Sequence, residues 1–460
     1  MEIEGRAVYS DWLWIPKGIL HEPSIRASLT FLQKGYRQDT RVRGWKETAD
    51  HIAVPREFFS RDKLISMGIE RDDQIPEFEK VGVEDRVTLD LLSGGAKTTQ
   101  RDAYEKLSRT ENGVLQLGCG HGKTVIALKH ICDRQVPAIV IVETKDLLEQ
   151  WKEAIDQFTD LGAGTGLIQG PISRWSWRKP ITIAMIQSLA RYHDEVPEQL
   201  REWFGTAVYD EAHHLSSKFF VRAAPMFYGK RIGLTATPRR EDGLEGLYYA
   251  HIGRPFHKDI QQPLTPKAII YTLDLPVDWN SRDVVEDITD IQGELSFPKL
   301  WGFIGRQPTF QSKVRSVILR SVNNGRKVLV LSHRVDTLVR LNEALGKADV
   351  GEVGLVTGSV APEQRRRSLK TCSIVLGTMQ LAKEGLDEKR LDTLLLLEPF
   401  AAEGVLQQAA GRILRTYENK QQPIIGIIRV SFAPCYSLVA KLRKHFRKWP
   451  TKVELREMSI

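Results

Sequence analysis

From about residue 110 onward, short runs of apolar and β-branched residues alternate with longer stretches in which apolar residues recur every three or four positions. The short runs predict buried strands, and the longer stretches predict amphipathic helices. Regular alternation of the two is typical of parallel sheets covered by helices. The first block contains five predicted strands, Gly113–Leu117, Ala138–Val142, Ile181–Met185, Ala207–Asp210 and Arg231–Leu234.

A second block with the same alternation begins near residue 327. Its apolar runs have a similar length and are again separated by helical patterns, so we expect a second parallel sheet. The chain therefore belongs to the α/β class, with two parallel-sheet domains in tandem. The five strands predicted here are Lys327–Leu331, Val353–Val356, Ser373–Leu376, Thr393–Leu396 and Ile424–Val430.

The residues outside these two blocks follow different patterns. Up to about residue 90, aromatic and β-branched pieces are broken by prolines and glycines, which predicts a small β-rich accessory domain. Residues 263–310 contain several prolines and the polar run Asn280–Asp283, which predict a connector with some structure of its own. We therefore expect an accessory domain over 1–90, a first α/β domain over 91–262, this connector, and a second α/β domain over 311–460.

The composition excludes several classes of protein. With 460 residues, 42% hydrophobic and 27% charged, the chain has material for about three folded domains and is neither disordered nor fibrous. Its apolar runs fall far short of the ~18 residues that a membrane span needs, and its acidic start is unlike a signal peptide. The four cysteines include no CxxC pair, which argues against a disulfide framework or a structural metal. We expect a soluble protein of a reducing cytoplasm.

Positive charge is concentrated near the C-terminal end. The net charge is +8, and residues 410–460 hold eleven Lys and Arg against three Asp and Glu, which accounts for the whole surplus. The densest part, Lys441–Lys452, follows apolar residues at helical spacing and predicts a basic helix end. Such an end is either a solvated helix face or a contact for a polyanion.

A glycine-rich segment lies between the predicted strand that ends at Leu117 and a helical pattern. Small residues let backbone N–H groups wrap an anion at a helix N-terminus, a lysine reaches the β- and γ-phosphates, and a hydroxyl binds Mg²⁺. The general pattern of such loops has Gly where this chain has Leu117, so the match departs at one position. The segment predicted to bind nucleotide phosphate is Gly118, Cys119, Gly120, His121, Gly122, Lys123 and Thr124, with Thr124 on the metal.

Two adjacent carboxylates, Asp210 and Glu211, stand at the end of a predicted strand. One carboxylate in such a place can hold Mg²⁺ through water, and the next can polarise the attacking water. We assign Asp210 to the metal and Glu211 to the general base. Adjacent acids are common in loops, but their pairing with an upstream phosphate loop indicates ATP hydrolysis with Mg²⁺.

With these motifs the chain resembles the superfamily 2 helicases and translocases, whose DEAH motif stands here as Asp210-Glu211-Ala212-His213. Further motifs match that family in order between about residues 100 and 415, and the resemblance implies two tandem RecA-like domains. The implied roles are adenine recognition by Gln100, coupling of hydrolysis to strand movement by His213, Thr235 and Thr237, nucleotide contacts by Gly385 and Asp387 in motif V, and catalysis by Gln408, Arg412 and Arg415 in motif VI.

Arg412 and Arg415 stand three residues apart in a helical pattern, which places both guanidinium groups on one helix face. By the resemblance, they reach the γ-phosphate of a nucleotide held by the other domain. An arginine finger of this kind contributes about 10³ to 10⁵ in rate. Catalysis then depends on closure of the two domains around ATP.

The resemblance also implies contacts to a nucleic-acid strand through hydroxyls, backbone amides and basic groups rather than base edges. Each of these residues is equally compatible with a helix cap or a turn. The family usually has Thr where this chain has Met185, so one phosphate contact is either absent or supplied by Gln187 or Ser188. The predicted contacts are Thr144, Lys145, Gln187, Arg334, Thr357, Gly358 and Thr378.

Arg240-Glu241-Asp242 resembles an element of xeroderma-type repair helicases, and phage recombination and branch-migration helicases share this layout, which points to DNA. The phage group also has a compact N-terminal domain that engages duplex DNA, so residues 1–90 are expected to do the same. The resemblance thus implies an ATP-dependent DNA helicase or translocase that moves 3′ to 5′ and acts on forks and junctions as a monomer. Its expected partners are a single-stranded tracking strand and a branched duplex, in the cytoplasm of a bacterium or a phage-infected host.

Two other functions fit the same motifs. The motor of a restriction or remodelling complex would move along duplex DNA without separating its strands. A nucleotide-dependent nucleic-acid clamp would bind without turnover, although the intact Lys123, Glu211 and Arg415 argue against it. Trp175 and Trp177, each next to an arginine, are compatible with stacking on unpaired bases or with packing on one face of a hairpin, and we favour packing.

Overall fold

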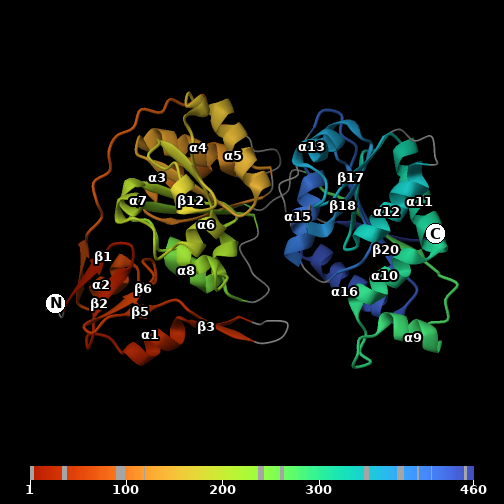
Figure 1. Ribbon diagram of the computed structural model, residues 1–460, viewed down its shortest axis with the longest axis horizontal. Coiled ribbons are helices and arrows are strands. Elements are labelled where there is room, and N and C mark those ends of the chain that lie inside the picture. The colour runs from red at the N-terminus through yellow and green to blue at the C-terminus, as the bar shows by residue number, and fades with distance from the viewer. Residues whose placement is uncertain are drawn as a thin grey trace. The chain divides into compact units, whose positions relative to one another are not determined.

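The computed structural model describes residues 5–33, 39–89, 99–118, 120–236, 243–259, 264–346, 352–380, 388–400, 403–415, 417–449 and 453–460. The chain forms two compact units, Met1–Ile260 and Gln261–Ile460 (Figure 1). Within the described ranges, no helix has both the length and the apolar character needed to span a bilayer.

The first unit is built on a sheet of seven parallel strands in the order β10-β11-β9-β12-β13-β8-β14. The five strands predicted for this block are confirmed to within one residue at each end, and β10 and β14 are additional edge strands. The strands are β8 (Gly113–Leu117), β9 (Ala138–Val142), β10 (Gly166–Ile168), β11 (Ile181–Met185), β12 (Thr206–Tyr209), β13 (Lys230–Thr235) and β14 (Pro255–Asp259).

Helices cover both faces of this sheet, which explains why its central strands are apolar along their whole length. One face packs against α3 (Gln100–Arg109), α4 (Lys123–Arg134) and α5 (Lys145–Phe158). The other face packs against α6 (Ile186–Arg191), α7 (Glu198–Trp203) and α8 (Glu245–Ile252).

The N-terminal part of the first unit is a small mixed sheet with strand order β5-β6-β2-β1-β7 and a separate hairpin of β3 and β4. This confirms the β-rich accessory fold expected from the broken aromatic and β-branched pieces. The elements are β1 (Gly5–Tyr9), β2 (Leu13–Pro16), α1 (Glu22–Ser28), β3 (Thr30–Gln33), β4 (Thr40–Arg43), β5 (Lys46–Glu47), β6 (His51–Val54), α2 (Arg61–Ser66) and β7 (Ile69–Asp73).

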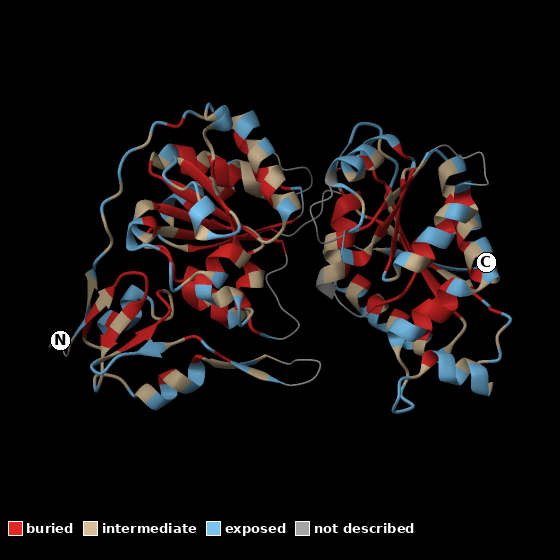
Figure 2. Cartoon of the chain, in the orientation of Figure 1, coloured by how far each residue is buried: buried red, intermediate tan, exposed pale blue. Residues whose placement is uncertain are grey.

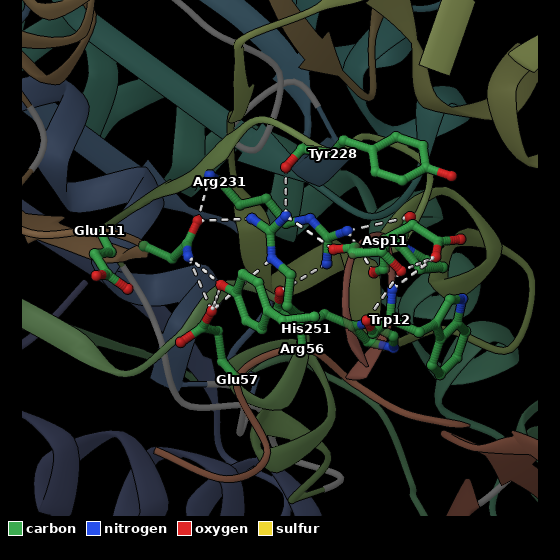
Figure 3. Close-up of polar contacts among 12 residues, drawn as sticks. Asp11, Trp12, Arg56, Glu57, Glu111, Tyr228, Arg231 and His251 are labelled. Atoms are coloured by element: carbon green, nitrogen blue, oxygen red, sulfur yellow. Dashed lines mark hydrogen bonds and ion pairs between the residues drawn. The ribbon is translucent and has the colours of Figure 1, made fainter. Parts of the chain in front are cut away.

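Two buried arginines fasten this accessory sheet to the seven-stranded sheet (Figure 3). Arg56, just after β6, donates to the carbonyl oxygens of Tyr228 (2.6 Å) and Gly229 (2.7 Å). Arg231 lies in β13 and donates to the carbonyl oxygen of Asp11 at 2.7 Å. Because both guanidinium groups are buried and hydrogen-bonded across the boundary, they join the accessory sheet to the first sheet. The accessory sheet has a hydrophobic core of its own, to which α8 contributes Ala250.

The second unit is built on another sheet of seven parallel strands, in the order β17-β18-β16-β19-β20-β15-β21. The five strands predicted for this block are confirmed, with ends shifted by at most two residues. The strands are β15 (Lys267–Leu273), β16 (Val328–Ser332), β17 (Val353–Val356), β18 (Ile374–Thr378), β19 (Thr393–Leu396), β20 (Ile424–Val430) and β21 (Glu454–Ser459).

Helices again cover both faces of the sheet, and Figure 2 shows its central strands as a buried layer between them. One core contains side chains of α13 (Pro362–Thr371), α15 (Glu403–Ile413) and α16 (Ala433–Arg447). The other contains side chains of α9 (Arg282–Ile288), α10 (Phe297–Arg306), α11 (Pro308–Asn323) and α12 (Val335–Gly346).

The stretch expected to be a connector, residues 263–310, contributes directly to the second unit. β15 pairs in parallel with β20 on one side and β21 on the other, and α10 buries Leu300 and Trp301. The sequence did not indicate this because the partners of β15 lie more than a hundred residues away. One of them, β21, is a polar strand whose side chains are all exposed, so it carries no apolar signal.

Candidate active site

The predicted phosphate loop connects β8 to α4 at the carboxyl edge of the first sheet. Gly120 and Gly122 have φ values of 81° and 76°, a left-handed conformation that favours glycine. A Cβ on Gly122 would lie 2.2 Å from Nε2 of Gln100, so a side chain at this position would displace the end of the Gln100 side chain. The loop thus presents bare backbone at the N-terminus of α4, as anion binding requires. Cys119, also predicted here, lies outside the described residues.

Side chains around this loop are held by short local contacts. Lys123 Nζ donates to the carbonyl oxygens of Leu117 (3.1 Å) and Gly118 (3.4 Å). Gln100 is the first residue of α3 and donates from Nε2 to the carbonyl oxygen of His121 at 3.4 Å. Thr124 lies in the first turn of α4. The sequence-predicted residues of this loop are therefore brought together with Gln100.

The DEAH motif follows β12, which lies two strands from β8 in the sheet. Asp210 is half-buried and accepts from the backbone N–H of Glu211 (3.0 Å to Oδ1) and from the indole N–H of Trp151 (2.8 Å to Oδ2). Burial and the neighbouring charge of Glu211 raise the pKa of Asp210 to about 6. Glu211 has a φ of 46°, a left-handed conformation that is strained for a residue with a Cβ.

His213 connects the DEAH motif to the end of β13. Its Nδ1 lies 3.1 Å from Oγ1 of Thr235 and 3.4 Å from Oε2 of Glu211. Thr235 is the last residue of β13 and is fully buried. The two described residues of the predicted coupling group are thus in direct contact, whereas Thr237 lies outside the described residues, as does the element Arg240-Glu241-Asp242.

The first unit has the donors and acceptors that a nucleotide phosphate with Mg²⁺ requires. Among the described residues, Oε2 of Glu211 is buried and makes no hydrogen bond. Two carboxylates side by side and shielded in part from water repel each other unless a cation compensates them. Thr124 and Asp210 are the residues that fit the metal, and the backbone from Gly120 to Lys123 fits the phosphates.

Trp151 is a residue of the site that the sequence interpretation missed. It lies on α5, is 1% exposed, and its indole N–H binds the carboxylate of the DEAH aspartate, Asp210. Its spacing with Leu148 and Ile155 only indicates the apolar face of a helix, so no local signal separates it from a core residue. Only the tertiary structure, which brings α5 to the residue that follows β12, reveals the contact.

The residues of the first unit predicted to contact a strand have local hydrogen-bonding roles. Thr144 caps α5, because its Oγ1 accepts from the backbone N–H of Leu147 at 3.2 Å, and Lys145 is the first residue of that helix. Gln187 donates from Nε2 to the carbonyl oxygen of Glu143 at 2.6 Å. These contacts bring Gln187 next to the segment that carries Thr144.

In the second unit, the predicted strand contacts lie where parallel strands end at the same sheet edge. Thr378 is the last residue of β18 and pairs in register with Ser332, and Thr357 follows β17, the other neighbour of β18. Thr357 Oγ1 shares a hydrogen bond of 2.9 Å with Ser359, and Gly358 faces open space. Arg334 follows β16 at this edge, and its Nε lies 3.0 Å from Oδ1 of Asp336.

The motif VI arginines differ from the prediction in one respect. Gln408 and Arg412 lie in α15 with the spacing of one helix face, but the helix ends at Ile413, so Arg415 lies beyond it. Beyond the helix, Leu414 is fully buried, and Lys420 Nζ donates to the carbonyl oxygen of Arg415 at 2.8 Å. Gly385 and Asp387 of motif V lie outside the described residues.

Trp175 and Trp177 pack against the first unit. Trp175 donates from Nε1 to the carbonyl oxygen of Gly170 at 2.9 Å and meets the ring of Tyr192 edge-on at 6.0 Å. Trp177 meets Trp203 edge-on at 6.1 Å. Both tryptophans are half-buried against the core of this face, in agreement with the packing interpretation.

Comparisons with known proteins agree with these two units. Residues 93–240 match the family described as type III restriction enzyme, res subunit, and residues 311–417 match the helicase conserved C-terminal domain. A protein of Acanthamoeba polyphaga mimivirus, named as an ATP-dependent RNA helicase, is 25% identical over 387 residues, which is 82% of this chain and 71% of the relative. The DNA 3′-5′ translocase XPB2 of Sulfurisphaera tokodaii is 31% identical over 176 residues, which is 37% of each chain. That match thus spans well under half of the length of XPB2.

A solved structure has a similar fold at low sequence identity. Dbp5 of S. cerevisiae, bound to RNA and ADP BeF3, superposes with a TM-score of 0.56 and 12% identity, covering 78% of this chain and 89% of that one. This likeness concerns the fold and supports the assignment of both sheets as RecA-like domains.

Proposed function

We propose that this chain, an ATP-dependent helicase of superfamily 2, uses ATP hydrolysis to move along DNA and to unwind or remodel forks and junctions. Its relatives include XPB-type DNA helicases and viral and phage helicases. The observation that carries the proposal is that, within the first unit, the DEAH residues contact the segments proposed to bind the strand and to couple hydrolysis to its movement. The DEAH residues touch Thr235 through His213, and they touch α5, which begins at Lys145, through Trp151.

ATP and Mg²⁺ are the proposed cofactors. Lys123 and the backbone of residues 118–124 hold the phosphates, Gln100 contacts the adenine, and Thr124 with Asp210 holds the metal. Mg²⁺ supplies positive charge against the phosphate oxygens. Glu211 accepts a proton from the attacking water at its carboxylate.

The second unit supplies the remaining catalytic groups in this proposal. Gln408, Arg412 and Arg415 act on the γ-phosphate, and Gly385 with Asp387 contacts the nucleotide. An arginine at the γ-phosphate stabilises charge that develops during transfer, and it is worth about 10³ to 10⁵ in rate. In this proposal hydrolysis requires both units. Each turnover then changes the contacts that the two units make with the strand.

The tracking strand is proposed to contact both units through its phosphates. The residues are Thr144, Lys145 and Gln187 in the first unit and Arg334, Thr357, Gly358 and Thr378 in the second. Thr144 Oγ1 already accepts the backbone N–H of Leu147, so the phosphate contact proposed for Thr144 would involve the N-terminal end of α5 as well.

Residues 1–90 are proposed to bind the duplex part of a branched substrate. Arg41 and Arg43 are exposed on β4, and the guanidinium of Arg43 lies 5.5 Å from the ring of Trp45. An exposed basic strand with an aromatic neighbour suits contacts to phosphates and sugars. We further propose that these residues form an accessory domain, with RecA-like domains following it, and that the protein acts as a monomer.

A second candidate function is movement along duplex DNA without strand separation. The match of residues 93–240 to the restriction-enzyme res subunit family favours it. The two candidates share the ATP site and differ only in whether the strands part.

The test compares ATP hydrolysis and strand release on single-stranded DNA, blunt duplex, a fork, a four-way junction and single-stranded RNA. We expect DNA to stimulate hydrolysis and labelled strands to leave the fork and the junction. Displacement of a bound block from blunt duplex, without strand release, would support the second candidate. Stimulation by RNA alone would contradict the choice of DNA.

Glu211→Gln is the matched control for that test. Removing the carboxylate that accepts the proton, while leaving the phosphate loop intact, should abolish turnover and keep ATP binding. Strand release by this variant would show that a contaminating enzyme is measured. ATP hydrolysis at the wild-type rate would show that another group is the base.

A further inference from the structure

Lys420 joins two segments of the second unit that are far apart in sequence. Its Nζ donates to the carbonyl oxygen of Lys389 at 2.8 Å and to the carbonyl oxygen of Arg415 at 2.8 Å. Arg415 ends motif VI, and Lys389 lies two residues after Asp387, the last residue of motif V. One ammonium group therefore joins the backbone at the end of motif VI to the segment that follows motif V.

These hydrogen bonds hold backbone carbonyls, so they fix a position and do not compensate a charge. α15 ends at Ile413, and its last carbonyl groups have no partner within the helix. Arg415 lies just past this end, where the helix no longer holds the backbone. The contact with Lys420 replaces that restraint at the residue whose guanidinium must be placed.

The ammonium group of Lys420 lies in the wall of an open cavity of about 350 Å³. Acidic groups around it are Glu388, Asp392 and Glu418, and basic or phenolic groups are Arg326, Lys327, Arg390, Arg415 and Tyr417. Burial lowers the pKa of Lys420 to about 8, with Arg415 adding to the shift and Asp392 and Glu388 opposing it. Because the cavity is open to solvent, a proton can leave the group without unfolding.

We propose that Lys420 is a positioning residue, which holds the backbone of Arg415 against that of Lys389 and so sets where the Arg415 guanidinium stands during ATP hydrolysis. This rests on the role proposed above for Arg415. A neutral amine has one donor fewer than an ammonium and forms weaker hydrogen bonds. The hydrogen bonds from Lys420 to both carbonyl groups therefore weaken as Lys420 loses its proton.

The test measures DNA-stimulated ATP hydrolysis between pH 6.5 and 9.5 for wild type, Lys420→Met, Lys420→Arg and Arg415→Ala. Misplacement of a catalytic group costs about 10- to 100-fold, so Lys420→Met should lower kcat by this factor with little change in KM for ATP. Lys420→Arg stays protonated over the whole range and should keep its rate at pH 9.5, where the wild type declines. Lys313→Met, on the exposed face of α11, is the matched control and should behave as wild type.

The outcomes separate this proposal from the one on which it rests. Arg415→Ala with a wild-type rate would overturn the role of Arg415 and the positioning role together. If Arg415→Ala is inactive but Lys420→Met retains the wild-type kcat, only the positioning role is overturned. Should Lys420→Met not fold, the comparison of wild type with Lys420→Arg decides, because identical decline of both above pH 8 would contradict the proposal.

Discussion

The side chain of Trp151 shows how a single buried residue orients a charged one. Asp210 has two oxygens, and the indole N–H holds one of them at 2.8 Å while the other accepts from the backbone. The carboxylate therefore has one orientation before any ligand arrives. Groups that orient a metal ligand in this way usually affect metal affinity by about 10- to 100-fold when removed.

Trp151→Phe tests this contact, because phenylalanine keeps an aromatic ring in the core and lacks the N–H donor. We expect the Mg²⁺ concentration that gives half-maximal ATP hydrolysis to rise by about 10-fold. Trp203→Phe is the control, since that indole donates only to the carbonyl oxygen of Lys179, at 3.4 Å. An unchanged Mg²⁺ dependence in Trp151→Phe would mean that Asp210 does not bind the metal or needs no orientation.

At the scale of elements, a buried carboxyl group holds the turn between β16 and α12. Glu398 accepts from Ser332 Oγ at 2.6 Å and from the backbone N–H of His333 at 3.0 Å. Burial raises the pKa of Glu398 to about 7 in the folded protein, although these two hydrogen bonds act in the opposite direction. The turn that it holds carries Arg334, one of the proposed strand contacts.

The raised pKa of Glu398 predicts how the stability of this turn depends on pH. A carboxyl group that binds its proton more tightly when folded stabilises the fold below its ordinary pKa, and this stabilisation is lost as the pH rises through about 7. The change should be about 3 kcal/mol between pH 4.5 and 8. Hydrogen exchange of the peptides from β16 and α12 at several pH values, converted to opening free energies with the intrinsic exchange rate at each pH, would measure this change.

Glu398→Gln removes the titration and should flatten this pH dependence. The amide leaves one of the two donors without an acceptor, so we also expect a loss of about 1 kcal/mol that does not vary with pH. Glu343→Gln, on the exposed face of α12, is the control. If the opening free energy of these peptides in the wild-type protein does not depend on pH, the prediction is contradicted.

For the molecule as a whole, buried hydrogen bonds fasten the accessory sheet to the rest of the first unit. Arg56 makes four of them, with Ser10 just after β1, with Asn112 just before β8, and with Tyr228 and Gly229 just before β13. A truncation that removes residues 1–90 would leave Arg231 without the carbonyl oxygen of Asp11 and would remove the buried Val83 from the core of the first sheet. Truncation is thus a poor test of DNA binding by this region.

Arg56→Met should destabilise the first unit by about 3 to 5 kcal/mol, because several buried carbonyl groups lose their donor at once. Unfolding in urea, followed by tryptophan fluorescence, would measure the loss in the free energy of unfolding. Arg6→Met is the control, since that side chain is 64% exposed and binds only Glu70. Equal stability of the two variants would mean that the accessory sheet is not fastened through Arg56.

DNA binding by the accessory sheet is better tested at its surface. The double variant Arg41→Glu and Arg43→Glu reverses two exposed charges outside the arginine interface, so the free energy of unfolding should stay near that of the wild type. Its affinity for a fork should fall. The slope of log K against log salt concentration should decrease in magnitude by about one to two. Unchanged fork affinity would place the duplex contact elsewhere on the molecule.

The periodicity of the chain was enough to predict both parallel sheets, because a strand buried on two faces is apolar along its whole length whatever its neighbours are. The phosphate loop and the DEAH motif were equally visible, since their chemistry lies in residues that are adjacent in sequence. β21 was missed for the opposite reason: it is a strand through its pairing with β15, and its exposed side chains carry no pattern.

Contacts between distant residues were decided only by the tertiary structure. Trp151 and Asp210 are separated by 59 positions, and Arg231 and Asp11 by 220, so no local pattern links them. The same holds for Lys420, whose proposed role depends on two carbonyl groups, and for Arg415, which lies beyond the end of α15. The sequence thus determined which chemistry this protein carries, and the fold decided which groups hold that chemistry in place.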